Sequence, residues 1–198
     1  MIEFRDVEPN DVPFLKLFHK WVYPWIAQDD DPFDEEQLTF ENLYENYTMV
    51  FLNEEKDIIG SMSFDTINSD LRASLHFAIR PSYIKSLLRD NIHLYSLMDR
   101  FKVLKVKRFV LAIPEYATTA KKLAIKTGFK YIATFEEDVY RGGKPCNVDF
   151  YQMTKKDLAK QMVRLFIEEN ADVADEVLIG EEKVTPLRRN YGRKRKLK

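Results

Sequence analysis

Three histidines and one cysteine are the residues of this 198-residue chain best suited to acid–base, nucleophilic or metal chemistry. The histidines are His19, His76 and His93, and their spacing does not match the HExxH pattern of a zinc site. Cys146 stands alone, which excludes an internal disulfide and a zinc site of the multi-cysteine type. We therefore expect no metal site.

A second candidate position lies at the end of an apolar run. Glu115 and Tyr116 follow Phe109–Ile113, and open mixed sheets often bind ligands where a strand ends. The phenol of Tyr116 is able to donate a proton. The simpler interpretation is a loop, residues 114–117, that leads into a helix, and we favour it.

Alternating and helical spacing of apolar residues predicts the elements that must position these side chains. The pattern favours strands at residues 2–8, 49–52, 58–64, 71–80, 108–113, 129–140 and 147–153. It favours helices at residues 14–22, 34–47, 83–101, 118–127 and 155–169. Gly128 is expected to end the fourth of these helices. Antiparallel strands followed by a βαβ unit predict an α/β chain with a mixed sheet and flanking helices.

Composition indicates a folded chain with a charged end. Hydrophobic residues make up 45% of the sequence, and the net charge is -1. Residues 181–198 carry an excess of positive charge, whereas acidic clusters occupy residues 29–36 and 168–182. No apolar run reaches the roughly 20 residues that a membrane span needs. We expect a cytoplasmic protein without a signal peptide or a membrane partner.

The sequence divides by composition into three parts. Residues 1–155 contain the predicted sheet, residues 156–180 a C-terminal helix extension, and residues 181–198 a flexible basic tail. Such a tail can neutralise phosphates or dock on an acidic protein surface, and a merely solubilising role is an equal alternative. The residues predicted to bind a partner are Arg188, Arg189, Arg193, Lys194, Arg195 and Lys196.

The order of elements resembles the GNAT (GCN5-related N-acetyltransferase) superfamily over residues 1–155. Leu123-Ala-Ile-Lys-Thr-Gly-Phe129 is similar to the family's LYxKxGF, and Ile79-Arg-Pro-Ser-Tyr83 to its VxPxY. Residues 137–144 resemble the hairpin before the last strand. The resemblance implies a GNAT-like mixed sheet with helices on it.

The acetyl-CoA loop of that family departs from its pattern in this sequence. The family continues with [RQ]-G-x-G-[AIV]-[GA], whose backbone N–H groups hold the pyrophosphate of acetyl-CoA. The corresponding positions here are Ile84, Lys85, Leu87 and Arg89, so that every signature position is lost. The family's Tyr that donates a proton to the departing CoA thiolate falls at Ala124. The family's Asn that contacts the cofactor falls at Ala117. We expect neither a catalytic nor a cofactor-binding residue at these places.

His76 is the histidine that this resemblance singles out. The strand before the pyrophosphate loop borders the family's substrate cleft, and His76 lies in it. The simpler alternative is a histidine whose hydrogen bonds are satisfied by a neighbour on the sheet.

The lost loop leads to the hypothesis that this chain has a GNAT-like fold without acetyltransferase activity. On this hypothesis the chain is a structural or assembly component with a protein partner or with copies of itself. GNAT-like virion and head-assembly proteins of tailed bacteriophages offer a further resemblance, through Arg141–Lys144 and Gln152–Lys155. The chain would then lie within a phage particle, with no cofactor.

Two alternatives remain open at this stage. The first is a divergent acetyl-CoA-dependent N-acetyltransferase, in which backbone groups around Ile79 and residues 87–89 would hold the cofactor. The second is a nucleic-acid-binding regulator that uses the tail as an electrostatic clamp.

Overall fold

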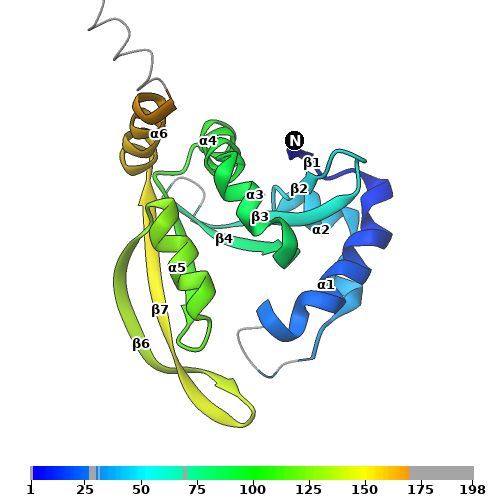
Figure 1. The fold of residues 1–198 in the computed structure, drawn as a ribbon. Coiled ribbons are helices and arrows are strands. Elements are labelled where there is room, and N and C mark those ends of the chain that lie inside the picture. Colours follow the sequence, from blue (N-terminus) through cyan, green and yellow to red (C-terminus); the bar gives the residue numbers. More distant parts are fainter. Residues whose placement is uncertain (1, 27–29, 31, 69–70, 170–198) are drawn as a thin grey trace, which may run out of the picture. The chain divides into compact units, whose positions relative to one another are not determined.

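The computed structural model describes residues 2–26, 30, 32–68 and 71–169 (Figure 1). The strands are β1 (Glu3–Asp6), β2 (Met49–Leu52), β3 (Ile58–Asn68), β4 (Arg72–Ile79), β5 (Arg108–Pro114), β6 (Lys130–Arg141) and β7 (Lys144–Thr154). The α-helices are α1 (Val12–Ile26), α2 (Phe40–Glu45), α3 (Ile84–Arg89), α4 (Ile92–Leu104), α5 (Thr118–Thr127) and α6 (Lys155–Glu169).

The described strands form one mixed sheet, as the sequence predicts. Their order is β1-β2-β3-β4-β5-β7-β6. β4 and β5 are parallel, and the other neighbouring pairs are antiparallel. The parallel pair is joined by α3 and α4, because parallel strands need a long crossover.

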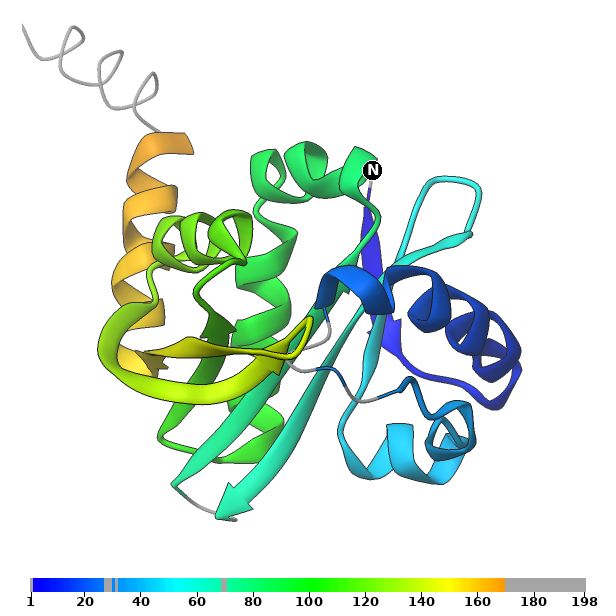
Figure 2. The ribbon, with the colours of Figure 1, turned by 90° about the horizontal axis from the view of Figure 1, so that it is seen from below.

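Helices cover both faces of this sheet (Figure 2). Phe18 and Val22 of α1 pack against Ala78 of β4, which places α1 on one face. On the opposite face Phe101 of α4 stacks on Phe109 of β5, with their ring centroids 3.9 Å apart. Strand residues alternate between faces, so that neighbours in sequence on β3 and β4 contact different helices.

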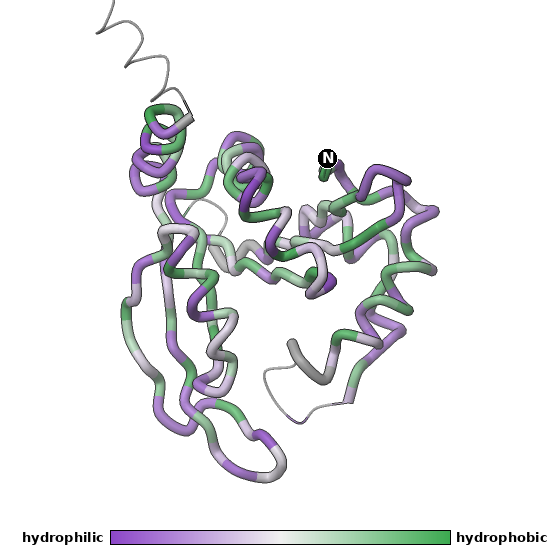
Figure 3. The backbone as a smooth tube through the Cα atoms, in the orientation of Figure 1, coloured by the Kyte–Doolittle hydropathy of each residue, from purple (hydrophilic) through white to green (hydrophobic). Residues whose placement is uncertain are grey.

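The amphipathic pattern of α1 explains how it packs. Leu15 is buried together with Leu43 of α2 and Val50 of β2, whereas Leu17 and Trp21 remain exposed. The alternation of apolar and polar residues along α1 is visible in Figure 3. This packing carries His19, which lies next to Phe18, to the sheet.

The prediction of one continuous helix at residues 34–47 is wrong in part. The segment contains a 3-10 helix, Glu35–Gln37, followed by α2. Thr39 separates them, because its backbone is extended and its hydroxyl accepts a hydrogen bond from the N–H of Asn42 at 3.2 Å. Side-chain capping of this kind begins a new helix and ends any continuous one.

The single helix expected at residues 83–101 is also wrong. The chain forms a 3-10 helix, Pro81–Tyr83, then α3 and α4. Asn91 breaks the helix with a left-handed backbone (φ 55°), a conformation that Asn tolerates better than most residues. The break redirects the chain, so that Leu87 of α3 and His93 of α4 line one cavity.

The predicted elements after residue 108 are confirmed with small changes at their ends. α5 ends at Thr127, and Gly128 follows it with a φ of 101°. The hairpin between β6 and β7 is tighter than expected, because Gly142 and Gly143, both with positive φ, form its turn.

The chain consists of two compact units, residues 1–162 and 163–198. The first contains the sheet, and the structure describes residues 163–169 of the second. The predicted tail, with the six basic residues predicted to bind a partner, lies outside the described residues, and the three-part division stays a prediction. None of the helices in the described part of the chain has the length and apolar character that a membrane crossing requires.

Candidate functional site

The site is built where β4 and β5 separate. Their pairing joins Arg72–Ser74 to Arg108–Val110 and goes no further. Beyond that point β4 stays paired with β3 up to Ile79, and β5 stays paired with β7 up to Pro114. The two strands therefore diverge without losing their outer partners, and a cavity of about 210 Å³ lies between them.

This cavity passes through the sheet. Ser61, Ser63 and His76 line it from the face that α1 covers, and His19 of α1 lies beside them. Met62, Leu75 and Phe77 belong to the opposite face, and they also line it. One molecule placed in the gap can thus contact groups from both faces of the sheet.

The end of the cavity on the α4 face is largely apolar. Leu87, Leu97 and Leu123 contribute side chains from α3, α4 and α5. His93 also lies here, with Nδ1 3.3 Å from the carbonyl oxygen of Leu87. Burial lowers the pKa of His93 to about 4, so that this imidazole is neutral near neutral pH.

The end on the α1 face is polar. Nε2 of His76 lies 2.8 Å from Oδ2 of Asp65. The register explains this pair, because Ser63 is opposite His76 and Asp65 comes two residues later on the same face. Nε2 of His19 lies 2.9 Å from the hydroxyl oxygen of Ser61. Burial, and then the nearby His76, lower the pKa of His19.

Helix α3 occupies the place of the family's glycine loop. Leu87 is fully buried and forms part of the cavity wall, whereas Lys85 and Arg89 are exposed. Arg89 pairs with Asp90 at 2.7 Å. The side chain of Leu87 therefore forms a wall of the cavity at the place where the glycine loop offers backbone, and the cavity remains open beside this side chain.

Ala120 and Ala124 of α5, together with Ala117 just before the helix, also line the cavity. Their spacing of three and four residues places them on one helix face. Ala117 and Ala124 are the positions where the family has Asn and Tyr. Their small side chains leave room in the cavity, and this alanine stripe is the signal by which the sequence reveals it.

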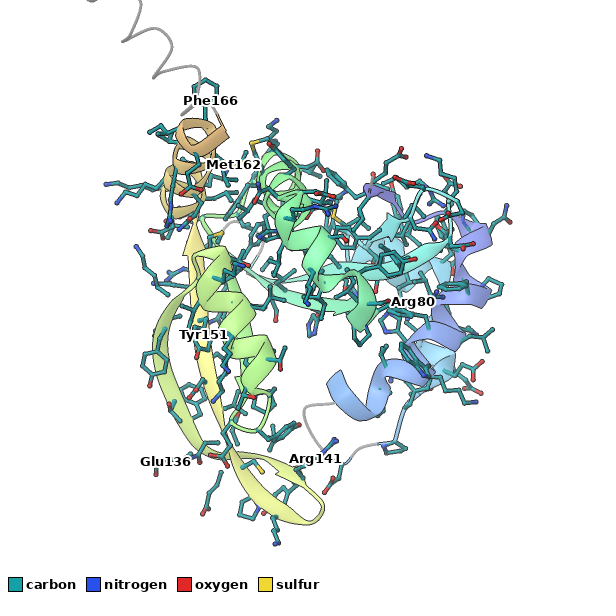
Figure 4. All side chains as sticks on the ribbon, in the orientation of Figure 1. Arg80, Glu136, Arg141, Tyr151, Met162 and Phe166 are labelled. Atoms are coloured by element: carbon teal, nitrogen blue, oxygen red, sulfur yellow. The ribbon has the colours of Figure 1, made fainter. Side chains whose placement is uncertain are left out.

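Tyr116 lies at the cavity next to the hairpin. The guanidinium carbon of Arg141 is 5.2 Å from the centre of the Tyr116 ring. Asp30 accepts hydrogen bonds from the N–H groups of Gly142 and Gly143, both at 2.8 Å, which joins the α1–α2 connection to the hairpin turn. Figure 4 shows Arg141 at this turn. The favoured interpretation of residues 114–117 as a plain loop missed this contact with the cavity.

The structure thus brings together residues that the sequence left apart. His76, which was singled out, lies at the cavity, and His19 and His93 line it as well. Sequence spacing gave no sign of this, because the three histidines belong to different elements, β4, α1 and α4.

The cavity residues fit the acyl end of acetyl-CoA better than its diphosphate. The acetyl thioester that ends the pantetheine arm is small and largely apolar, like the wall formed by Leu87, Leu97 and Leu123. The diphosphate would find Lys85 in the first turn of α3 in place of glycine N–H groups.

Solved structures of several acetyltransferases share this arrangement. The fold of this chain is the GNAT fold. A spermidine N-acetyltransferase SpeG chimera from Vibrio cholerae and hSSAT matches with a TM-score of 0.67 and 20% identity, over 80% of this chain and 98% of that chain. SpeG from Vibrio cholerae in complex with CoA and spermine matches with a TM-score of 0.65 and 17% identity, over 80% and 98%.

A putative acetyltransferase from Acinetobacter baylyi ADP1 is similar to the same extent. Its TM-score is 0.65 at 16% identity, over 78% of this chain and 92% of that chain. No family model matches the sequence, and no curated protein matches it.

The prediction of a non-catalytic structural or assembly protein of a tailed phage is wrong. The similar solved structures named above are acetyltransferases, one of them putative, and none of them supports the phage resemblance. The error lay in equating lost glycines with a lost binding cavity. Leu87 shows why this does not follow, because its side chain forms a wall of the cavity and does not fill it.

Proposed function

We propose that this chain is an acetyl-CoA-dependent N-acetyltransferase. The observation that carries the proposal is the cavity between β4 and β5, which is apolar on the α4 face and polar on the α1 face. Such a gap allows a thioester and an amine to approach each other from opposite faces of the sheet. The acetyltransferases that share the fold support the same activity.

The residues on the apolar side would hold the acyl end of acetyl-CoA. Leu87, Leu97 and Leu123 bury its chain, and the separated strands offer backbone groups that have no ladder partner across the gap. When bound, acetyl-CoA supplies a thioester whose carbonyl carbon is open to attack by an amine. Lys85, exposed in the first turn of α3, offers positive charge to the diphosphate.

The catalytic contribution of the fold is mainly position. Holding two reactants in the right geometry supplies a large part of the rate enhancement of many transfers. The small side chains of Ala117, Ala120 and Ala124 leave space for this, and the missing Tyr at Ala124 removes one proton donor without closing the site.

Calorimetric titration with acetyl-CoA, followed by an assay of thiol release with amines, tests this function. We expect saturable binding with a dissociation constant between about 1 μM and 1 mM, the range of most enzyme substrates. Ala124→Phe should fill the cavity and abolish binding. Ile125→Phe is the matched control, because Ile125 is the next residue and is exposed to solvent.

Two results would overturn the proposal. One is the absence of acetyl-CoA binding at 1 mM by the unaltered chain. The other is equal binding by the two variants, which would place the ligand outside the cavity. Circular dichroism of both variants checks that they fold.

A further inference from the structure

The polar end of the cavity holds an imidazole with a fixed partner. Asp65 and His76 come from adjacent strands, and Oδ2 of Asp65 lies 2.8 Å from Nε2 of His76. A carboxylate accepts hydrogen bonds and does not donate them. In the neutral imidazole, the hydrogen is therefore on Nε2, which faces Asp65. The remaining nitrogen, Nδ1, is then the one that can take up a proton.

Both members of this pair are in contact with solvent. The side chain of His76 is 50% exposed and that of Asp65 is 44% exposed. A proton taken up by His76 can therefore pass on to water. This is a difference from His93, which is buried at the other end of the same cavity.

The groups that face His76 from the part of the chain that the structure describes add no positive charge near neutral pH. His19 approaches from α1 with a lowered pKa and is held at the hydroxyl of Ser61, while Ser63 lies opposite His76 on β3. Tyr116 lines the same cavity from the loop after β5. A cation placed here meets hydroxyl oxygens and the imidazoles of His19 and His76, and the carboxylate of Asp65 pairs with His76.

The described residues that line the cavity include neither Lys nor Arg. A carboxylate or phosphate next to the reacting amine would therefore find no cation within the cavity wall. An alkylammonium group, in contrast, matches the hydrogen-bond acceptors at this end.

We propose that His76, positioned by Asp65, accepts the proton of the substrate's ammonium group, and that the substrate is a primary alkylamine without an anionic group near the amine. This inference rests on the proposed N-acetyltransferase function and names its base and its substrate class.

The ammonium group loses one proton to Nδ1 of His76, which passes it to solvent. The freed nitrogen forms a bond with the carbonyl carbon of acetyl-CoA, and the carbon–sulfur bond breaks with its electron pair on sulfur. The second proton lost from nitrogen ends on that sulfur, so that the products are an N-alkylacetamide, the CoA thiol and one proton.

The first test is the pH dependence of His76→Ala with 1,4-diaminobutane as the amine. At pH 7 we expect kcat/KM to fall by about 10²–10⁴, the usual effect of losing a general base. The loss should shrink towards pH 9.5, because an alkylamine with a pKa of about 10.4 then supplies far more neutral nucleophile. Added imidazole should restore part of the activity at pH 7.

Asp65→Asn tests the positioning role. It should reduce kcat by about tenfold at pH 7 with little change in KM, since Asp65 acts through His76. Acetyl-CoA binding, measured by calorimetry, should be unchanged in His76→Ala and in Asp65→Asn. A variant that merely unfolds would lose this binding.

The substrate class is tested with 4-aminobutanoate, which has the chain length of 1,4-diaminobutane and a carboxylate in place of one amine. We expect its kcat/KM to be at least about tenfold lower, the cost of roughly one unpaired charge. Equal values of kcat/KM for the two compounds would overturn the proposed substrate class. A loss of kcat/KM in His76→Ala that does not change with pH would overturn the assignment of His76 as the base.

The two proposals fail in distinguishable ways. Absence of acetyl-CoA binding by the unaltered chain would overturn the N-acetyltransferase function, and the base with it. Binding and turnover of amines with full activity in His76→Ala would leave the function intact and overturn the base alone. Binding without turnover of 1,4-diaminobutane would overturn the substrate class.

Discussion

His93 illustrates how the tertiary environment changes the chemistry of a single residue. Its imidazole is buried beside Leu87 and holds a pKa of about 4, against the ordinary value of 6.5. In the unfolded chain the same group takes up a proton near its ordinary pKa. The unfolded state therefore binds more protons than the folded state between about pH 6.5 and pH 4.

We predict that the free energy of unfolding decreases as the pH falls through this window. The contribution of His93 is about 3 kcal/mol at most, since a shift of one pKa unit corresponds to about 1.4 kcal/mol. Urea titrations at pH 7 and pH 4.5 measure it. His93→Asn retains a side-chain amide near the position of Nδ1 but does not ionise, so that the difference between the two pH values should become smaller. An unchanged difference would assign the acid sensitivity to other groups.

At the scale of elements, α4 is held against β1 by an ion pair. The Arg100 side chain is 5% exposed and pairs with Asp6 of β1, which is 69% exposed. Arg100 also lies 3.4 Å from Asp99 on its own helix. Since α4 carries Leu97 and His93 to the cavity wall, this pair helps to position the site.

We predict that Asp6→Ala destabilises the fold by about 1–3 kcal/mol, because it removes a partner from a buried guanidinium. The double variant Asp6→Ala/Arg100→Met should be more stable than Asp6→Ala alone, since Met fills the space without a buried charge. Thermal and urea denaturation of both variants measure this. A double variant less stable than Asp6→Ala would show that the Arg100 guanidinium contributes through contacts other than Asp6.

At the scale of the whole molecule, positive charge is concentrated at the C-terminal end of the chain. Residues 181–198 carry eight basic and two acidic residues, whereas the rest of the chain is acidic overall. We predict that full-length protein elutes from a heparin column at higher salt than a chain that ends at residue 180, because basic side chains bind polyanions by releasing counterions.

A chain of full length provides the matched control for that measurement. Replacing Arg193, Lys194, Arg195 and Lys196 by Gln removes charge without changing length. This variant should also elute at lower salt, while acetyl-CoA binding stays unchanged. Elution of the truncated chain at the salt concentration of the full-length protein would exclude the tail as a polyanion-binding segment.

Local pattern was enough to predict most elements of the fold. The alternation in β3 and β4, the apolar run of β5 and the stop of α5 at Gly128 are set by residues close in sequence. The two errors, at residues 34–47 and 83–101, have local causes too. Thr39 and Asn91 interrupt helices by capping and by a left-handed backbone, signals that helical periodicity hides.

The sequence by itself determined the GNAT-like order of elements, the missing glycine loop and the small residues of α5, because each depends on residue types at short spacing. The tertiary structure alone decided that His19, His76 and His93 share one cavity and that Leu87 forms its wall without filling it. The physical reason is that β4 and β5 separate beyond Ser74 and Val110. A gap of this kind arises from how whole strands pair with their outer neighbours. Residues from five separate segments, 19, 61–63, 75–78, 87–97 and 111–129, must come together to line it.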